Sequence, residues 1–175
     1  MKVSVFIATS LDGFIAKEDG DITWLNEASL KAKDEDYGYD SFMEESEYLV
    51  MGRGSFEKVL EFDKWPYEGQ KVIVVSKSLT ILPTKLQNTT LFSGEIKELY
   101  TQLKNDGCKK IYIDGGKLIS SFINEKLVTD MCITTIPILL GKGRRLFEDI
   151  TITQELKTME SLKYPSGFIK TTYNF

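Results

Sequence analysis

Tyr48-Leu49-Val50-Met51-Gly52-Arg53-Gly54-Ser55-Phe56-Glu57 is the stretch of the chain on which the fold prediction rests. It begins with a short apolar run, too brief for a buried helix, and this predicts a strand that is covered on both faces. A turn with two glycines follows, after which apolar residues return with helical spacing. A strand, a glycine turn and a helix start would place unpaired backbone N–H groups beside Arg53, an arrangement that suits phosphate. An ordinary strand-to-helix turn with a surface arginine is the alternative interpretation.

A second stretch, from Lys110 to Phe122, repeats this pattern with an apolar strand, the pair Gly115-Gly116 and an amphipathic helix. Because glycine has no side chain, a ligand could approach the backbone closely at this pair. The spacing differs from the dinucleotide fingerprint G-x-G-x-x-G, so a standard Rossmann fold is not predicted. Two strand ends suited to anions predict a ligand with phosphates at both ends of a groove.

The composition describes an ordinary globular protein and limits its partners. The 175 residues are enough for one domain with a sizeable core, so we expect a single domain over residues 1–175. A net charge of −4 offers no electrostatic reason to expect nucleic acid or an anionic membrane, which leaves a small-molecule substrate as the expected partner. No stretch resembles a signal peptide or a membrane span, and we therefore expect a cytoplasmic protein.

Two features of the composition exclude whole classes of catalysis. The chain has no histidine, which removes Ser-His-Asp and Cys-His catalysis together with histidine metal ligands. Its two cysteines, Cys108 and Cys132, are single and far apart, so neither a metal site nor a disulfide framework is expected.

The remaining patterns predict an alternation of strands and helices. Apolar runs predict strands at 3–8, 71–77 and 91–92, and helical spacing predicts helices at 34–46 and 96–107. This alternation indicates an α/β fold with a mostly parallel central sheet flanked by helices.

A terminal β-hairpin is predicted from 153–163 and 168–175, which flank a Pro-containing turn. In parallel sheets ligands bind at the carboxyl ends of the strands, and four residue pairs fall at such predicted ends. These pairs are Asp12-Gly13, Gly52-Arg53, Ser76-Lys77 and Gly115-Gly116. Their convergence predicts a dinucleotide groove.

Three motifs of the chain resemble those of a known family. Met51 to Glu57 resembles the M-G-R-x-[ST]-[WF]-E segment of dihydrofolate reductases. Ser10 to Ala16 and Pro137 to Phe147 resemble S-x-D-G-x-I-A and P-x-L-L-G-x-G-x-x-L-F. The last two are typical of the reductase domain of riboflavin-biosynthesis deaminase-reductases. The resemblance covers nearly the whole chain and implies a dihydrofolate reductase-like fold.

The resemblance also implies NADPH as the cofactor. Arg53 would pair bidentately with the adenosine 2′-phosphate, a task that suits its planar fork better than lysine. The other implied cofactor contacts are Ser76 and Lys77 at the adenosine end, Gly52, Gly54, Ser55, Gly115, Gly116, Lys117 and Leu118 at the pyrophosphate, and Ala8 and Ile15 at the nicotinamide.

The substrate side is less determined by the sequence. Trp24 is either a core residue or a wall against a planar substrate. For the proton donor, the resemblance implies a carboxylate near Asp36, and Asp12 is the alternative unless it only shapes its Asp-Gly turn. The basic residues Lys142, Arg144 and Arg145 would either meet a phosphoribosyl group or belong to a solvated loop.

The function implied by the resemblance is NADPH-dependent reduction, by hydride transfer, of 5-amino-6-(5-phosphoribosylamino)uracil in riboflavin biosynthesis. A dihydrofolate reductase and a non-catalytic NADP-binding dimeric protein are the alternatives. The family also implies a homodimer, for which the apolar segment 127–140 is either an interface or a core strand.

Overall fold

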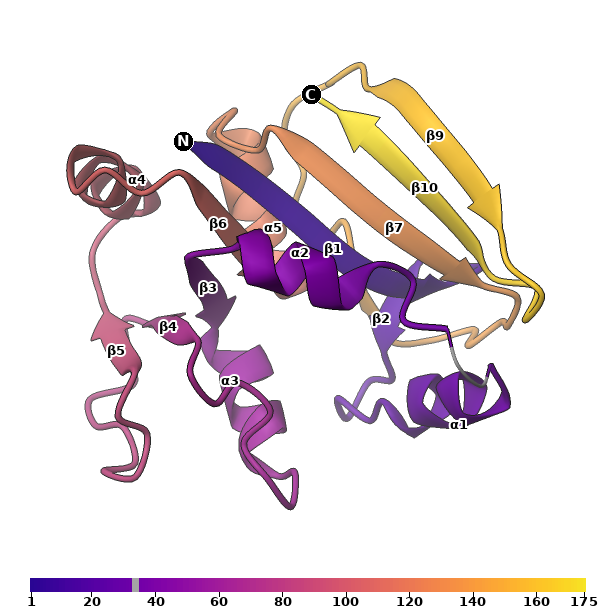
Figure 1. Ribbon diagram of the computed structural model, residues 1–175, viewed down its shortest axis with the longest axis horizontal. Coiled ribbons are helices and arrows are strands. Elements are labelled where there is room, and N and C mark those ends of the chain that lie inside the picture. Colours follow the sequence, from indigo (N-terminus) through magenta and orange to yellow (C-terminus); the bar gives the residue numbers. More distant parts are fainter. Residues whose placement is uncertain (33–34) are drawn as a thin grey trace.

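The computed structural model describes residues 1–32 and 35–175, which form ten strands and five helices (Figure 1). The strands are β1 (Lys2–Ser10), β2 (Phe14–Ala16), β3 (Tyr48–Gly52), β4 (Lys71–Val75), β5 (Thr89–Phe92), β6 (Lys110–Asp114), β7 (Asp130–Ile136), β8 (Arg144–Arg145), β9 (Lys157–Lys163) and β10 (Ile169–Asn174). The helices are α1 (Thr23–Lys31), α2 (Tyr39–Glu45), α3 (Arg53–Leu60), α4 (Ile96–Asn105) and α5 (Gly116–Asn124).

Eight of the strands form one sheet in the order β5-β4-β3-β6-β1-β7-β10-β9. From β5 to β7 all neighbours run parallel, whereas β10 is antiparallel to both β7 and β9. The predicted α/β fold with a mostly parallel sheet and a C-terminal antiparallel hairpin is confirmed. The first hairpin strand is shorter than predicted because Lys157 already pairs with Asn174, the last residue of β10.

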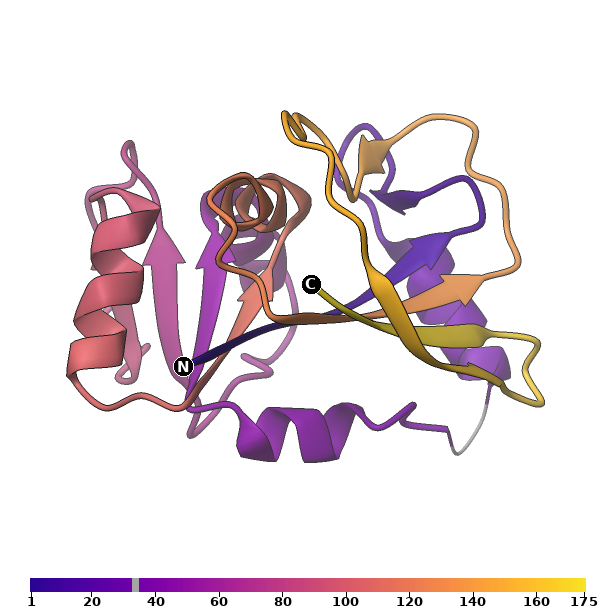
Figure 2. The ribbon, with the colours of Figure 1, turned by 90° about the horizontal axis from the view of Figure 1, so that it is seen from above.

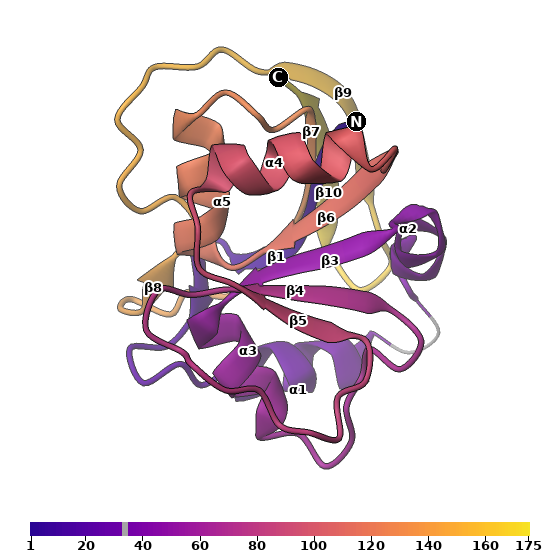
Figure 3. The same ribbon diagram turned by 90° about the vertical axis from the view of Figure 1, so that its left-hand side faces the viewer.

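Alternating side chains explain why the buried strands read as continuous apolar runs. In β3, Val50 belongs to the core cluster that contains residues of α4 and α5. Its neighbours Leu49 and Met51 belong to the cluster on the opposite face, which includes side chains of α2 and α3. Helices therefore cover both faces of the sheet, with α4 and α5 on one face and α1, α2 and α3 on the other (Figures 2 and 3).

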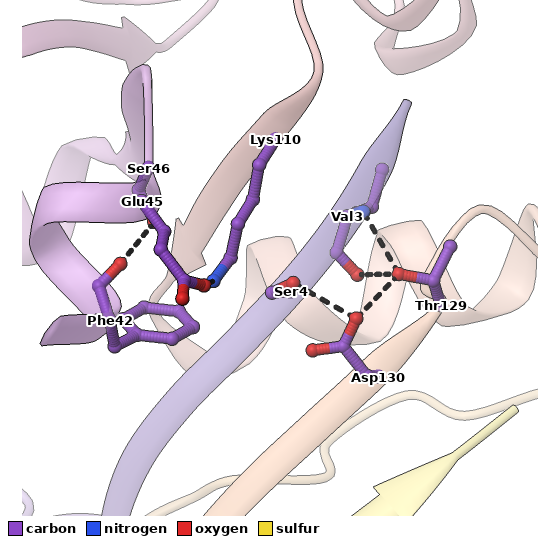
Figure 4. Close-up of polar contacts among 8 residues, drawn as sticks. All are labelled: Val3, Ser4, Phe42, Glu45, Ser46, Lys110, Thr129 and Asp130. Atoms are coloured by element: carbon purple, nitrogen blue, oxygen red, sulfur yellow. Dashed lines mark hydrogen bonds and ion pairs between the residues drawn. The ribbon is translucent and has the colours of Figure 1, made fainter. Parts of the chain in front are cut away.

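Side-chain hydrogen bonds join strands at the amino-terminal ends of β1 and β7 (Figure 4). Thr129 Oγ1 donates a hydrogen bond to the carbonyl oxygen of Val3 and accepts one from the N–H group of Val3, both at 3.0 Å. Ser4 Oγ donates to Asp130 Oδ1 at 3.0 Å. These contacts hold the end of the sheet that is remote from the expected ligand site.

The predicted helix at 34–46 is shorter in the structure, where α2 begins at Tyr39. Gly38 has a φ of 83°, and Asp36 Oδ1 accepts its N–H group at 2.9 Å, so the chain turns before the helix starts. Asp34, which the prediction included, lies outside the described residues.

The apolar segment 127–140 contributes β7, which pairs with β1 on one side and with β10 on the other. Met131 and Ile136 of this strand are buried, so the strand itself belongs to the core. Leu139, beyond the strand, is 70% exposed, and an interface there stays a prediction. None of the helices in residues 1–32 and 35–175 is long and apolar enough to cross a membrane.

Truncation of the core tests the packing of α5 against the sheet. Phe122 is fully buried, so Phe122→Ala is expected to lower the free energy of unfolding by about 3–5 kcal/mol through lost contacts and the cavity left behind. Leu30→Ala is the control, because Leu30 is 74% exposed and its truncation should change stability by less than about 0.5 kcal/mol. Urea unfolding measures both, and equal losses would contradict the assignment of the core.

Candidate active site

A cleft of about 1330 Å³ lies at the carboxyl ends of β1, β3, β4, β6 and β7. This volume exceeds the roughly 300–1,000 Å³ of ordinary small-molecule sites, so the cleft has room for a dinucleotide and a second molecule. Its position agrees with the rule that parallel sheets bind ligands at the carboxyl ends of their strands.

The structure brings all of the predicted cofactor-binding residues to this cleft. Its lining includes Ala8, Ile15, Gly52, Arg53, Gly54, Ser55, Ser76, Lys77, Gly115, Gly116, Lys117 and Leu118. Of the tentative proton donors, Asp36 lines the cleft and Asp12 does not. Trp24 does not line it either.

The first turns of α3 and α5 lie against each other at the centre of the cleft. Met51 pairs with Asp114 in the sheet, which places Gly52 beside Gly115. A side-chain carbon built on Gly115 would lie 2.6 Å from Ser55 Oγ, and Gly115 has a φ of +97°, so this position accepts glycine alone. Two sets of unpaired helix N–H groups thus face one space, where their partial positive charge favours a phosphate.

Arg53 and Lys77 form the outer end of this space. The Arg53 guanidinium donates to Ser78 Oγ at 3.0 Å and lies 3.5 Å from the Glu57 carboxylate. Lys77 Nζ pairs with Glu95, and this hydrogen bond raises the pKa of the lysine. Because exposed ion pairs contribute little to stability, both cations can exchange these partners for a phosphate at small cost.

The short sheet formed by β2 and β8 lies over the two helix starts. Its pairing brings Arg144 opposite Ala16, and a side-chain carbon built on Gly54 would lie 3.7 Å from the Arg144 guanidinium. A carbon built on Gly116 would lie 2.6 Å from the carbonyl oxygen of Arg145. Both arginines line the cleft and make no ion pair with any described residue. The structure thus places both arginines beside the helix starts, whereas the sequence alone could not decide between a ligand contact and a solvated loop.

Asp12 connects the loops on either side of this short sheet. Its carboxylate accepts hydrogen bonds from Ser10 Oγ at 2.6 Å and from the N–H groups of Leu140 and Gly141, the latter at 2.7 Å. The Ser10 hydroxyl and then the backbone N–H groups lower the pKa of Asp12 to about 2. Asp12 is therefore ionised at neutral pH and lies outside the cleft, which favours its turn-shaping role over that of a proton donor.

The surroundings of Asp36 do not favour a proton donor, and those of Trp24 do not favour a wall against the substrate. Asp36 lines the cleft, but the N–H group of Gly38 lowers the pKa of its carboxylate, so it holds no proton at neutral pH. Trp24 is buried and packs in a cluster with Ile136 and Phe168. The core interpretation of Trp24 is thus the one that the geometry supports.

Asp114 is the carboxylate that sequence reasoning missed. It is the last residue of β6, is only partly exposed, and lines the cleft. Tyr112 Oη lies 2.9 Å from the Phe6 carbonyl, to which it donates, and 3.4 Å from Asp114 Oδ1. Burial raises the pKa of Asp114, and hydrogen bonds from Ser55 and other neighbours oppose this only in part. An acid directly before a glycine pair at the end of a buried strand was the available signal.

Tyrosines surround Asp114 within the cleft. Burial and the Asp114 charge raise the pKa of Tyr39 to about 12, and the same two causes raise the pKa values of Tyr67 and Tyr112. These hydroxyls therefore stay protonated at neutral pH and serve as hydrogen-bond donors. Among the described residues, no group of three or more Asp, Glu, Cys or His side chains is arranged to hold a metal ion.

Comparisons with known proteins show the family and the fold of the chain. Residues 1–170 match the family model described as the RibD C-terminal domain. The chain is 32% identical over 160 residues to the uncharacterized protein YwjB of Bacillus subtilis (strain 168). The aligned segment covers 89% of this chain and 88% of the relative.

Solved structures show the same fold. The crystal structure of a "Putative riboflavin biosynthesis protein" from Shewanella sp. PV-4 is 36% identical and superposes with a TM-score of 0.92 over 99% of this chain and 98% of that chain. A diaminohydroxyphosphoribosylaminopyrimidine deaminase/5-amino-6-(5-phosphoribosylamino)uracil reductase from Thermotoga maritima is 12% identical, with a TM-score of 0.73 over 99% of this chain and 56% of that one. The predicted dihydrofolate reductase-like fold is confirmed.

The position of Asp12 predicts a pH-dependent contribution to stability. Because its folded pKa lies near 2, below the unfolded value of 3.8, its hydrogen bonds stabilise the protein above pH 3.8 and are lost as the pH falls toward 2. Asp12→Ala is therefore expected to lower the Tm at pH 7, by an amount that shrinks on acidification. Asp63→Ala, in an exposed loop, is the control and should leave the Tm unchanged at either pH. Calorimetry at pH 7 and at a pH below 3.8 measures the loss in Tm. A loss that is the same at both pH values would contradict the assignment of hydrogen bonds to the ionised Asp12.

Proposed function

The chain belongs to the RibD C-terminal domain family, and on this basis we propose that it is an NADPH-dependent reductase acting on a small heterocyclic or ribosyl substrate. One observation carries the proposal: two helix starts meet Arg144 and Arg145, which make no ion pair with any described residue, in a cleft that continues to a half-buried acid, Asp114. When bound, NADPH would supply the hydride, and the protein would supply orientation, exclusion of water and a proton.

The residues of the cleft fit the two phosphate groups of such a cofactor. Arg53 would bind the adenosine 2′-phosphate, with Ser76 and Lys77 lining the adenosine end. The pyrophosphate would lie on the N–H groups of α3 and α5, where Gly115 leaves the space that a side chain would fill. Arg144 and Lys117, which line the same space, would neutralise its charge.

The nicotinamide would then lie near Ala8 and Ile15, which line the cleft between the helix starts and the far strands. Asp114 is the proton donor that this arrangement supports. The Tyr112 hydroxyl has one hydrogen, which it donates to the Phe6 carbonyl, and Asp114 Oδ1 lies within reach of the same hydroxyl oxygen. If Asp114 carries a proton, it can donate to that oxygen, and both contacts are then hydrogen bonds. Its raised pKa favours that proton, whereas the lowered pKa values of Asp12 and Asp36 oppose one.

The name of the Thermotoga maritima relative indicates the first acceptor to be tested, 5-amino-6-(5-phosphoribosylamino)uracil. The test combines a titration of NADPH, followed by its fluorescence, with assays of NADPH oxidation. Binding of NADPH together with turnover of this acceptor supports the proposal. Preference for dihydrofolate would instead assign a dihydrofolate reductase, and binding without turnover of any acceptor would assign a non-catalytic NADP-binding protein.

Replacement of Arg53 tests the cofactor assignment. Arg53→Ala is expected to weaken NADPH binding by about 1–3 kcal/mol, the usual loss of a charge-assisted contact, and to leave NADH binding nearly unchanged. Lys85→Ala is the control, because Lys85 is exposed and does not line the cleft. Parallel titrations with NADPH and NADH measure the effect. Equal losses of affinity for the two cofactors would show that Arg53 does not bind the 2′-phosphate.

Replacement of Asp114 tests the proton donor. Asp114→Asn is expected to lower kcat by about 10²–10⁴-fold without changing the affinity for NADPH, because the amide occupies the same space but transfers no proton. Asp130→Asn is the matched control, since Asp130 also accepts a serine hydroxyl but lies at the remote end of the sheet (Figure 4). It should retain kcat.

The same variant has a readout that does not depend on activity. The folded pKa of Asp114 lies above the unfolded value of 3.8, so the carboxyl group loses its proton more readily in the unfolded chain, and this lowers the stability of the folded protein at neutral pH. Asp114→Asn should therefore raise the Tm at pH 7, and this gain should vanish as the pH falls below 3.8. A lower Tm of the variant at pH 7 would contradict the assignment of a pKa that burial raises to Asp114.

A further inference from the structure

Arg144 and Arg145 belong to a two-stranded ribbon that is too short to hold them by itself. β2 has three residues and β8 has two, and their pairing is irregular between Phe14 and Ala16. A single two-stranded ribbon is at best marginally stable in water. The two arginines therefore need an anchor outside the ribbon if they are to stay beside the starts of α3 and α5.

Asp12 anchors the segment that leads into β8. Its Oδ1 accepts the N–H group of Leu140 at 3.1 Å, and its Oδ2 accepts that of Gly141 at 2.7 Å. Gly141 lies only three positions before Arg144 in the chain. The carboxylate thus fixes the backbone close to this arginine, although Asp12 itself does not line the cleft.

Ser10 anchors the other strand of the ribbon. Its hydroxyl donates to Asp12 at 2.6 Å and accepts the N–H group of Phe14 at 3.0 Å. The Phe14 ring is buried, and the Arg145 guanidinium lies over it, 4.7 Å from the ring centroid. Because a cation is attracted to an aromatic face, the position of Phe14 also sets that of Arg145.

The inner side of the ribbon fits closely against glycines. Side-chain carbons built on Gly20 and Gly54 would lie 3.1 and 3.7 Å from the Arg144 guanidinium. A carbon built on Gly116, at the start of α5, would lie 2.6 Å from the carbonyl oxygen of Arg145. A small shift of the ribbon would therefore move both guanidinium groups relative to the N–H groups of the helix starts.

We infer that Asp12 and Ser10 are positioning residues for the cofactor, because they hold Arg144 and Arg145 beside the space that the pyrophosphate of NADPH would occupy. Neither Asp12 nor Ser10 lines the cleft, so both act through the arginines. Cations that are fixed in advance lose less conformational entropy when a ligand binds, and this raises the affinity. The inference rests on the proposed function, which assigns the pyrophosphate to the helix starts.

Asp12→Asn tests the inference with little change in shape. The carboxylate accepts hydrogen bonds through both oxygens, and an amide replaces one of these oxygens with an NH₂ group that only donates. Fluorescence titration should show that NADPH and NADH both bind about tenfold more weakly, because the pyrophosphate is common to the two cofactors. Arg53→Ala is expected to weaken NADPH alone, so the two roles give different results.

A double-mutant cycle separates positioning from a general weakening of the fold. Arg144→Ala combined with Arg145→Ala removes the groups through which Asp12 acts. In that background Asp12→Asn should reduce the affinity for NADPH by less than about twofold, because changes that act through the same groups are not additive. A full tenfold loss in that background overturns the inference.

Thr129→Val is the matched control. Thr129 also bonds to the backbone of a residue far away in the chain, Val3, but it does so at the remote end of the sheet (Figure 4). Its replacement should leave the affinity for both cofactors within about twofold of the wild type. Equal losses of affinity in Asp12→Asn and Thr129→Val overturn the inference, since affinity would then follow any loss of hydrogen bonds.

Hydrogen exchange of the cofactor-free protein gives a readout that does not depend on binding. In Asp12→Asn the amides of 13–16 and 140–146 should exchange faster, while those of α3 and α5 keep the wild-type rates. Unchanged exchange in the ribbon overturns the inference. Failure of the wild-type protein to bind NADPH would instead refute the proposed function.

Ser10→Ala is the second variant, and it decides the outcome if Asp12→Asn does not fold. It removes the donor to Asp12 and the acceptor of the Phe14 N–H group. The same loss of affinity and the same faster exchange of the ribbon are expected. Wild-type affinity and wild-type exchange in this variant overturn the inference.

Discussion

The close contact of two helix starts is the constraint on which the candidate site depends. Strands β3 and β6 are neighbours and parallel, so the turns that leave them must occupy the same small space. The absence of a side chain at Gly115 lets Ser55 approach, and Gly116 allows the same for the backbone of β8. The result is one concentrated patch of unpaired N–H groups, with Arg53 at its outer end. Any larger residue at the glycine pair would separate the helices and disperse this patch.

Three carboxylates in and around the cleft show how the surroundings of a group decide its chemistry. Asp12 accepts three hydrogen bonds and is ionised, which makes it a connector of loops. Asp36 caps the turn before α2 and is also ionised. Asp114 loses solvation at the floor of the cleft, and its pKa rises. The same type of side chain is thus held in its charged form by hydrogen bonds in two places, whereas in the third place burial disfavours the charged form.

The mixed lining of the cleft follows from the layout of the fold. Helix starts, the turn after β4 and the β2–β8 ribbon lie at the ends of the strands and supply the lysines and arginines of the lining, together with Glu57 and Glu95. The aromatic rings of the lining lie on the face of the sheet, where side chains of β1, β6 and β7 alternate and point toward α1 and α2. Cations and aromatic rings thus come to one cleft from different elements of the fold.

The amino-acid sequence by itself determined the α/β fold, the strand-turn-helix units at Arg53 and Gly115-Gly116, and a set of twelve residues that line the cleft. These are local patterns, and the rule that parallel strands end at one edge brings them together. The tertiary structure alone decided which contacts these acids make across the chain, and how deeply each is buried. Burial is the first cause of the raised pKa of Asp114, whereas Ser10 and Gly38, each two residues away, are the first causes of the lowered pKa values of Asp12 and Asp36. Asp12 meets Leu140 and Gly141 across more than a hundred residues, and Asp114 meets the Phe6–Tyr112 contact. No local pattern contains that information.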